Sequence, residues 1–311
     1  GEPWAGFGKD VCAMALFRLL SEAEFMNPTR RNTQEDVHLV LSPFSAVAAA
    51  PGDEENHGPG EQGQAGGMDA VIALFDGHGG RGCVDFVSAA FPLNLRVFMD
   101  KAAKERREDG EGMGADEELR GPLLDRAMTS SFLLTDIQSS KFVEDASGTT
   151  GLVCYFRRRR KSGEVEVTVA NVGDTRCVLC RDGKAHRLSY DHKPEDQLEQ
   201  QRIEKTRGFT HAGRTLGVLA VSRSFGDHQF KRFVTAEPHI TTHTCTPQDK
   251  FLILACDGIW DVLTDDEAVK IVTTISAGST KIQEKDAAEV LVQEAARRGS
   301  TDNLSAIVVY F

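Results

Sequence analysis

Residues 71–80 read VIALFDGHGG, so that a short apolar run ends directly in an acidic, glycine-rich segment. The run 71–75 has the length and residue types of a buried β-strand. A carboxylate beside a buried strand is costly unless a partner satisfies it, and glycine at 77 lets other backbone approach closely. A single Asp-Gly after a strand is commonly only a turn. Asp76 therefore becomes a candidate site residue only if the same arrangement recurs.

The arrangement does recur, because four further apolar runs have acidic residues at one end. Glu35 and Asp36 precede the run 37–41, Asp174 follows the alternating run 164–169, Asp257 and Asp261 follow 251–256, and Asp302 precedes 305–311. Carboxylates that converge raise one another's pKa unless a cation lies between them. Oxygen ligands, to which the Gly77 carbonyl could be added, select hard cations such as Mg²⁺ or Mn²⁺. The strand ends thus predict a metal site, provided that they meet.

The order of the predicted elements favours an α+β fold. Strand-like runs follow one another, and helices are expected between them at 83–106, 194–205, 265–275 and 286–298. Thr264 is a plausible N-cap, and Gly299 suits the end of the last helix. The basic residues 157–161 and Gly163 separate two strand-like runs, which predicts a hairpin. Cys177 and Cys180 fall within one predicted strand and on opposite faces of it, which argues against a zinc motif.

Length, charge and cysteine content limit the classes of protein that fit. The 311 residues with a net charge of −11 predict a single domain over 1–311, with surface loops at 51–67 and 108–114 and no affinity for nucleic acid or anionic membranes. The run 11–20 is too short to span a bilayer. Seven cysteines without framework spacing favour an intracellular protein, cytoplasmic or nuclear. The first residue is Gly, so removal of a targeting segment stays open.

Several motifs follow one another along the chain. They are RNTQED at 31–36, FDGHGG at 75–80, SGTT at 147–150, VGDTR at 172–176, DHKP at 191–194, LAVSRSFGD at 219–227, DGIWD at 257–261 and TDN at 301–303. In this order they resemble the metal-dependent protein phosphatases of type 2C, from about Arg31 to Phe311. The resemblance implies a sandwich of two mainly antiparallel β-sheets flanked by α-helices. It also implies hydrolysis of phosphoserine and phosphothreonine in proteins by a metal-activated water, without a covalent intermediate.

The resemblance further implies a set of ligands for two divalent cations, Mg²⁺ or Mn²⁺, and for a weaker third. Asp76 would bridge the two cations. The remaining implied ligands are Asp257 and Asp302 at one cation, Glu35 and the Gly77 carbonyl at the other, Asp36 as a ligand or a holder of metal-bound water, and Asp174 with Asp261 at the third.

Two further residues receive roles in the reaction. The resemblance implies that Arg31 contacts the substrate phosphate, where a guanidinium suits the geometry of the oxygens. His78 could protonate the departing serine or threonine oxygen. The partners implied are phosphoprotein substrates, and the family is commonly monomeric.

The chain also departs from the family pattern in places. The segment before Arg31 does not look like the usual opening strand, residues 51–67 look like an insertion, and Arg207-Gly208 stands in the flap region where a Gly pair is common. These departures leave substrate choice and flap conformation open.

The residues also allow other classes of protein to be compared with this one. A Cys-x5-Arg spacing, as in cysteine-dependent phosphatases, occurs at Cys12–Arg18 and Cys154–Arg160, but neither place has a glycine-rich phosphate cradle. No Gly-x-Ser-x-Gly supports a serine hydrolase. A catalytically inactive scaffold would be expected to lack some of the metal carboxylates. The basic run 157–161 is interpreted as a solvated hairpin tip, with a nuclear localisation signal as the alternative.

Overall fold

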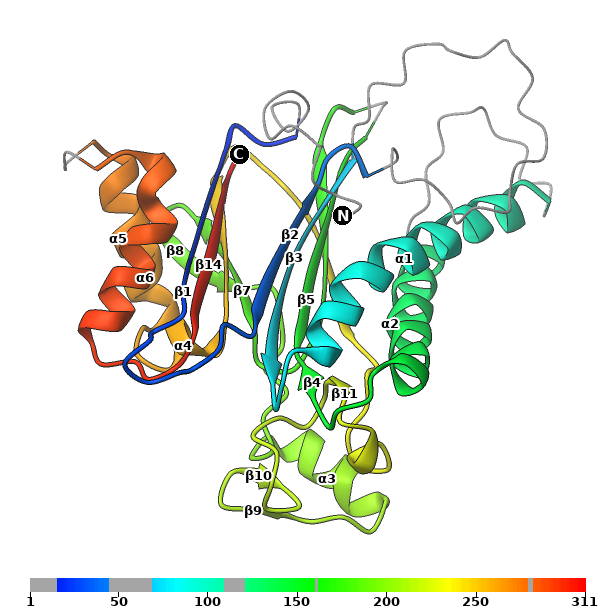
Figure 1. The fold of residues 1–311 in the computed structure, drawn as a ribbon. Coiled ribbons are helices and arrows are strands. Elements are labelled where there is room, and N and C mark those ends of the chain that lie inside the picture. Colours follow the sequence, from blue (N-terminus) through cyan, green and yellow to red (C-terminus); the bar gives the residue numbers. More distant parts are fainter. Residues whose placement is uncertain (1–15, 45–68, 109–120, 160–161, 279–281) are drawn as a thin grey trace, which may run out of the picture.

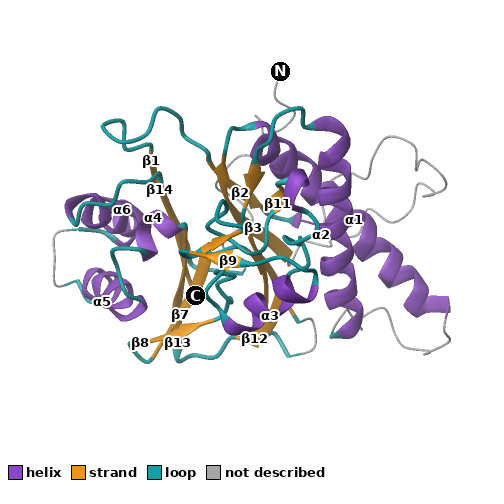
Figure 2. Ribbon diagram, turned by 90° about the horizontal axis from the view of Figure 1, so that it is seen from below, coloured by secondary structure: helices purple, strands orange, loops and turns teal. Residues whose placement is uncertain are grey.

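The computed structural model describes residues 16–44, 69–108, 121–159, 162–278 and 282–311. Two β-sheets lie face to face, and helices cover the outer face of each (Figure 1). The view from below shows the two sheets side by side between the helical layers (Figure 2). The predicted α+β sandwich with mainly antiparallel sheets is therefore confirmed. The two segments predicted as surface loops, 51–67 and most of 108–114, lie outside the described residues.

One sheet has five strands, and every neighbouring pair in it is antiparallel. In spatial order the strands are β1 (Leu19–Phe25), β14 (Leu304–Tyr310), β13 (Asp249–Ala255), β7 (Arg176–Arg181) and β8 (Lys184–Arg187). The central strands β14 and β13 are buried throughout most of their length, which explains their continuous apolar sequence.

The other sheet has seven strands. Its spatial order is β11 (Phe225–Gly226), β4 (Gly148–Thr149), β3 (Asp69–His78), β5 (Gly151–Arg158), β6 (Val165–Val172) and β12 (His239–Thr244), and β2 (Asp36–Leu41) pairs with β3. All of these pairs are antiparallel. The predicted hairpin at Gly163 joins β5 to β6.

Helices form the two outer layers and one projecting segment. The helices over the seven-stranded sheet are α1 (Gly82–Glu108) and α2 (Pro122–Phe142), and those over the five-stranded sheet are α4 (Asp257–Trp260), α5 (Asp265–Ser276) and α6 (Ala287–Arg297) (Figure 1). Residues 197–224, called the flap segment below, contain α3 (Gln197–Lys205) and a short hairpin of β9 (Thr210–His211) and β10 (Arg214–Thr215). In Figure 1 this segment lies below the sandwich.

Apolar side chains fill three separate layers of core. Alternate residues of one strand enter different layers: Val71 packs under α1 and α2, whereas Ile72 lies between the sheets. The third layer lies between the five-stranded sheet and α4–α6. Cys177 faces the layer between the sheets and Cys180 the layer under the helices, so their predicted placement on opposite faces of a strand is confirmed. Because both faces of β3 are covered, its sequence is apolar without alternation.

The first helix is long and apolar enough to cross a membrane, judged by length and composition alone. Its apolar residues Val84, Val87, Phe91 and Leu95 are fully buried in the core beside the seven-stranded sheet and α2. Packing against other protein elements therefore accounts for the composition of this helix.

The prediction for the segment before Arg31 is wrong, because this segment contains β1, which pairs with β14. The strand is hard to recognise because its most buried position is occupied by Ser21 rather than an apolar residue. The Ser21 hydroxyl donates to the Lys285 carbonyl at 2.7 Å and accepts from the Ala288 amide at 3.1 Å. A polar residue can thus occupy a buried strand position when both of its hydrogen bonds are made.

The second helix was not predicted, because polar residues interrupt its apolar face. Ser131, Thr135 and Ser139 are all buried. The Ser131 hydroxyl donates to the Ala127 carbonyl at 2.7 Å, and Thr135 accepts from the Asn94 amide at 2.8 Å. Hydrogen bonds within and between α1 and α2 satisfy these groups, so the helix is buried without a continuous apolar stripe.

The structure refines the other predicted helices. Helix α5 has the predicted Thr264 N-cap, with a complete capping box to Glu267. Helix α3 begins at Gln197 rather than at 194, and it is not wholly a surface helix because Glu199 and Ile203 are buried.

The basic run 157–161 is only partly at the surface. Arg157 is buried and pairs with Glu166 at 2.6 Å, whereas residues 160–161 lie outside the described part. The nuclear localisation alternative stays a prediction.

Candidate active site

The pairing of β2 with β3 brings the first acidic residues together. Asp36 and Asp76 are directly opposite each other in this antiparallel pair, so their side chains lie on the same face. The Gly77 amide donates to the Glu35 carbonyl at 3.1 Å. A Cβ atom at position 77 would lie 2.6 Å from this carbonyl oxygen, so the contact requires glycine.

The five-stranded sheet contributes a second acidic turn at the ends of β13 and β14. Asp257 begins α4 immediately after β13. A Cβ atom at Gly258 would lie 2.1 Å from the Asn303 carbonyl oxygen and 3.2 Å from Cβ of Asp302. The segment DGIWD therefore contacts the segment TDN, and backbone approaches closely at Gly258 as well as at Gly77, where the sequence predicted it.

Asn303 joins the two sheets at this edge. Its side-chain oxygen accepts from the Glu35 amide at 2.9 Å, and its side-chain nitrogen donates to the Met26 and Thr33 carbonyls at 2.8 and 3.1 Å. Arg31 pairs with the carboxylate of Asp302 and donates from Nε to the Thr301 carbonyl at 3.2 Å. These contacts connect the RNTQED and TDN segments, which are far apart in sequence.

The carboxylates converge at the meeting point of the sheets. Ligand atoms of Asp36, Asp76 and Cys256 all lie within 4.8 Å of one another. Burial, followed by the charges of other acids in the cluster, raises the pKa of Asp76 and of Asp257 well above the usual range. The other acids whose charges raise these two pKa values are Asp36, Asp174, Asp261 and Asp302, and the charge of Lys193 opposes them at Asp257. So many coupled acids in one place favour occupation by cations.

The chemistry of the cluster fits hard divalent cations. Both carboxylate oxygens of Asp36 are buried, and neither has a hydrogen-bond partner among the described residues. Burial raises the pKa of the Cys256 thiol, which keeps it neutral, and this thiol already donates to the Asn303 carbonyl at 3.4 Å. Carboxylates are thus the available anionic ligands, and the cluster can hold Mg²⁺ or Mn²⁺. Sequence reasoning did not single out Cys256.

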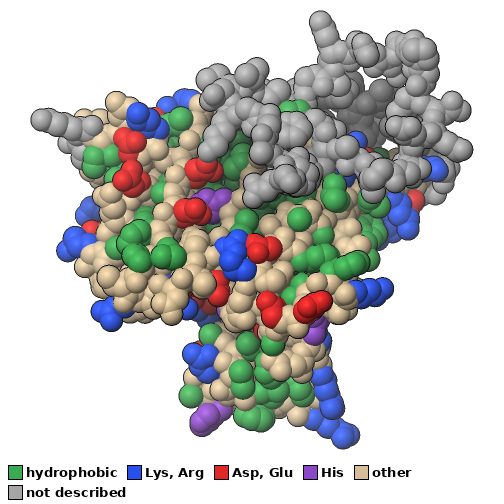
Figure 3. All heavy atoms as spheres, viewed as in Figure 1, with side chains coloured by type: hydrophobic (Ala, Val, Ile, Leu, Met, Phe, Trp, Pro, Cys, Tyr) green, Lys and Arg blue, Asp and Glu red, His purple; other side chains and the backbone are tan. Residues whose placement is uncertain are grey.

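Asp174 and Asp261 approach the cluster from other elements. Asp174 follows β6, its side chain is buried, and its carboxylate contacts the ammonium group of Lys193. Asp261 is exposed, and its charge acts on Asp257 and Lys193. The structure therefore brings all of the predicted acidic residues to one edge of the sandwich, with Asp261 at its outer rim. In Figure 3 acidic side chains and a Lys or Arg side chain appear together on the face above the flap segment.

His78 lies beside the acidic cluster and is held by a residue to which the sequence assigned no role. Its Nε2 lies 2.8 Å from Oδ2 of Asp227, whose side chain is 2% exposed compared with 33% for His78. The Ser224 hydroxyl donates to the same oxygen at 2.6 Å. Burial lowers the pKa of His78, but the hydrogen bond and charge of Asp227 outweigh it and raise the pKa above its usual value.

A glycine makes this pair possible. A Cβ atom at Gly148 would lie 2.2 Å from Oδ2 of Asp227 and 2.5 Å from Nε2 of His78. The acid-glycine pattern FGD at 225–227 was the available sequence signal for Asp227, although it does not by itself identify the histidine that it contacts.

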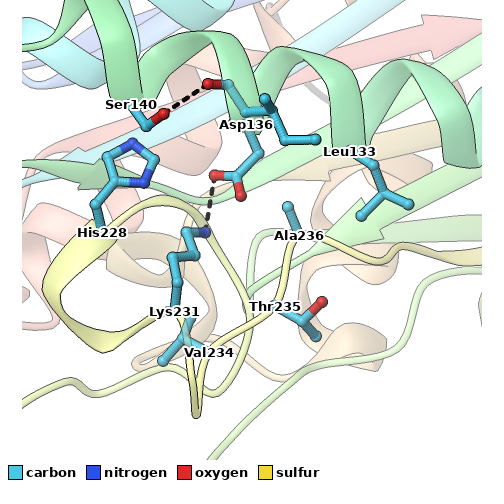
Figure 4. Close-up of a pocket in the computed structure, with 9 residues that line it drawn as sticks. Leu133, Asp136, Ser140, His228, Lys231, Val234, Thr235 and Ala236 are labelled. Atoms are coloured by element: carbon cyan, nitrogen blue, oxygen red, sulfur yellow. Dashed lines mark hydrogen bonds and ion pairs between the residues drawn. The ribbon is translucent and has the colours of Figure 1, made fainter.

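A separate pocket of about 300 Å³ lies between α2 and the chain after β11 (Figure 4). The ion pair between Asp136 and Lys231, at 2.8 Å, lies within it. The Ser140 hydroxyl is also satisfied, since it donates to the Ile137 carbonyl at 2.7 Å. The pocket is lined by Leu133, Asp136, Ile137, Ser140, His228, Lys231, Val234, Thr235 and Ala236. None of these described residues belongs to the carboxylate cluster, so the pocket is distinct from the candidate active site.

The fold and site define a class of hydrolase in which acidic residues from two packed sheets hold metal ions. The family model for protein phosphatase 2C matches residues 31–304. "Probable protein phosphatase 2C 8" of Oryza sativa subsp. japonica is 37% identical over 299 residues, which cover 90% of this chain and 72% of that protein. "Protein phosphatase 2C homolog 1" of Saccharomyces cerevisiae is 33% identical over 300 residues, covering 93% and 92%.

Solved structures agree on the fold. The crystal structure of serine-threonine phosphatase 2C from Toxoplasma gondii superposes with a TM-score of 0.72 at 23% identity and covers 95% of this chain and 96% of that chain. The chain belongs to the protein phosphatase 2C family, and it is a protein serine/threonine phosphatase of this metal-dependent class. The predicted family, fold and enzyme class are thereby confirmed.

Proposed function

We propose that this phosphatase uses two divalent cations, Mg²⁺ or Mn²⁺, held by the converging carboxylates, to hydrolyse phosphoserine and phosphothreonine in proteins. The observation that carries the proposal is that Asp36 and Asp76 lie side by side at the cluster centre and that no described Lys or Arg pairs with either carboxylate. When bound, the cations would lower the pKa of water and so supply a nucleophile near neutral pH. Asp76 would be shared by both cations.

The other ligands divide between the two sheets. Asp257 and Asp302, at the ends of β13 and β14, would complete the site of one cation. Glu35 and the Gly77 carbonyl, on the β2–β3 side, would serve the other, with Asp36 behind them as a ligand or as an acceptor for bound water. Asp174 and Asp261 would hold a weaker third cation.

Arg31 and His78 would act on the substrate. The Arg31 guanidinium already lies at the rim of the cluster through its contact with Asp302, and its planar fork suits two phosphate oxygens. The carboxylate of Asp227 accepts from Nε2 of His78 and raises the pKa of the ring. The protonated ring carries a second proton on Nδ1, which it would give to the departing serine or threonine oxygen. The partial exposure of His78 lets a substrate reach it.

The direct test is phosphate release from phosphoserine and phosphothreonine peptides, with and without a chelator. We expect release that stops on chelation, returns on addition of Mn²⁺ or Mg²⁺, and is much slower with a matched phosphotyrosine peptide. No release at any metal concentration would instead support the inactive scaffold.

Alkylation of the cysteines separates this proposal from a cysteine-dependent mechanism. Cys154, the described cysteine with the Cys-x5-Arg spacing, has a fully buried side chain in the layer between the sheets, so it is not an accessible nucleophile. Cys12 and Arg160 lie outside the described residues. We expect iodoacetamide to leave phosphate release unchanged under conditions in which a chelator abolishes it. Loss of activity on alkylation would favour the cysteine mechanism.

A further inference from the structure

Asp174, one of the two residues proposed for the weaker third cation, already contacts a cation that belongs to the chain. The Lys193 ammonium group pairs with its carboxylate. The charges of Asp257 and Asp261 also act on this ammonium group. A positive charge therefore lies among the acidic groups that a third cation would use.

The backbone around Lys193 is fixed by contacts with the turn that carries Asp174. The amide and the ring Nδ1 of His192 both donate to the Gly173 carbonyl, at 2.9 and 3.2 Å. The Asn171 side chain adds a hydrogen bond to the Tyr190 carbonyl at 2.7 Å. These bonds attach residues 190–192 to the turn at 171–173. The main chain thus places Lys193 beside Asp174, while its side chain stays free to rotate.

The two members of the pair differ in their access to water. The Asp174 side chain is 3% exposed, whereas that of Lys193 is 35% exposed. The Asp174 carboxylate is almost fully enclosed in the turn after β6, whereas the partly exposed lysine side chain has four rotatable bonds. The ammonium group can therefore withdraw into solvent while Asp174 stays in place.

We propose that Lys193 is a tethered competitor of the third divalent cation, which binds only when the ammonium group leaves Asp174. The inference rests on the third-cation part of the proposed function. It explains why this position would be weaker than the other two: binding there must displace an internal cation as well as dehydrate the metal ion. Lys193 lies just before α3, so the exchange takes place at the base of the flap segment.

The test is a count of bound Mn²⁺, obtained from the electron paramagnetic resonance signal of free Mn²⁺ during titration of the whole chain. Lys193→Met keeps the length of the side chain and removes its charge. We expect this variant to bind the weakest Mn²⁺ at least ~10-fold more tightly than wild type, with the tighter sites unchanged, because a unit charge a few ångströms away is removed. Thermal unfolding of the metal-free variants checks that each is folded.

Three further variants act as controls. Lys250→Met removes the same charge from an exposed position at the start of β13, seven residues before Asp257, and should leave all Mn²⁺ affinities unchanged. Lys193→Arg retains the charge and should leave the weakest affinity close to that of wild type. Adding Asp174→Asn to Lys193→Met should abolish the increased affinity for the weakest Mn²⁺, because the carboxylate that binds it is lost.

The possible results distinguish failure of the Lys193 competition from failure of the third cation site and from failure of the proposed function. An unchanged or weaker third affinity in Lys193→Met would overturn the competition and leave Lys193 as a structural ion-pair partner. Two tight Mn²⁺ ions with no third in any variant would overturn the third site and this inference with it, while the two-cation proposal would stand. No tight Mn²⁺ binding in wild type would overturn the proposed function itself.

Discussion

Asp36 at the cluster and Glu199 in the flap segment are equally buried, with exposed fractions of 3% and 1%. Burial raises the pKa of Asp36 to about 6, and the charge of Asp302 adds to the effect. Burial alone would also raise the pKa of Glu199, but Arg223 and Arg202 reverse the effect and lower this pKa to about 2. The same type of group thus has opposite electrostatics in two regions of the molecule.

The difference lies in the partners that the fold supplies. Glu199 accepts hydrogen bonds from Arg202 at 2.9 Å, Arg223 at 2.6 Å and the Ser222 hydroxyl at 2.8 Å. The cluster around Asp36 contains other acids instead, and both Asp36 oxygens lack hydrogen-bond partners among the described residues. A buried acid with internal cations stabilises the fold, whereas the adjacent Asp36 and Asp76, whose carboxylates pair with no described Lys or Arg, need cations from solution.

The largest expected effect is on catalysis, at the centre of the cluster. Asp76→Asn removes the charge proposed to be shared by two cations and should lower kcat/KM on a phosphoserine peptide by about 10³-fold, since metal ions contribute several kcal/mol to such reactions. The control is Asp266→Asn, an exposed acid on α5, which should retain full activity. If Asp76→Asn were as active as wild type, the acids of the cluster would not be required for catalysis, and the contrast with Glu199 would fail.

The next effect is on stability, in the flap segment. Glu199→Gln leaves Arg202 and Arg223 without a carboxylate and should lower the free energy of unfolding by about 3 to 5 kcal/mol, as expected when one partner of a buried ion pair is removed. Chemical denaturation measures this change. Glu204→Gln, an exposed position on the same helix, is the matched control and should change little. If both variants were equally stable, the network would not have the structural role argued here.

In metal-free protein, the contributions of Asp36 and Glu199 to the free energy of unfolding should change in opposite directions with pH. The folded pKa of Asp36 lies above its unfolded value, so its favourable contribution is complete below pH 3.8 and is lost as the pH rises through about 6. Glu199 stabilises fully above pH 4.5 and loses its contribution as the pH falls through about 2.

Urea unfolding in the presence of a chelator tests this contrast. The stability of Asp36→Asn relative to wild type should increase between pH 4 and pH 7 by at most about 3 kcal/mol, which is the free energy of a shift of about two pKa units. The deficit of Glu199→Gln should instead shrink as the pH falls from 4.5 toward 2. A pH-independent difference for Asp36→Asn would contradict the assigned direction of its pKa.

A smaller effect on catalysis is expected at His78. His78→Gln should slow hydrolysis of a phosphoserine peptide by about 10²-fold but have little effect on p-nitrophenyl phosphate, whose leaving group needs no proton. Asp227→Asn should affect the same substrate selectively, because it changes the partner that orients His78. Equal losses on both substrates would point to a structural role for the pair.

The smallest effect is expected where the flap departs from the family pattern. Arg207 has a φ of 64°, a left-handed conformation that favours glycine. Arg207→Gly should raise the free energy of unfolding by about 0.5 kcal/mol, as relief of the side-chain clash slightly exceeds the added flexibility of the unfolded chain. Arg207→Ala keeps a Cβ atom and should not stabilise the protein. Equal thermal shifts for the two variants would show that charge, not backbone conformation, matters there.

The apolar runs made much of the fold and the cluster predictable. Strands covered on both faces, such as β3 and β13, read as continuous apolar segments, and the acids beside them were visible without a structure. The motif order then indicated how the strand ends meet. Thr264 and Gly299 marked helix ends through local chemistry alone, which requires no tertiary contact.

The elements that were missed depend on contacts between distant segments. Ser21 in β1 and Thr135 in α2 interrupt their apolar faces, and only partners from other elements make their burial favourable. The role of Asp227 depends on Gly148, which allows the approach to His78. The internal cation at Asp174 likewise follows from the folding of the DHKP segment onto the turn after β6. Spacing in the sequence contains no sign of these pairings.

The central claim is that carboxylates from both sheets hold a pair of hard cations, and anomalous diffraction from crystals soaked in Mn²⁺ tests it most directly. We predict two strong peaks joined by the carboxylate of Asp76, one beside Asp257 and Asp302 and the other beside Glu35 and the Gly77 carbonyl. Peaks confined to other surfaces, or a cluster that stays free of Mn²⁺ at saturating concentration, would contradict the account.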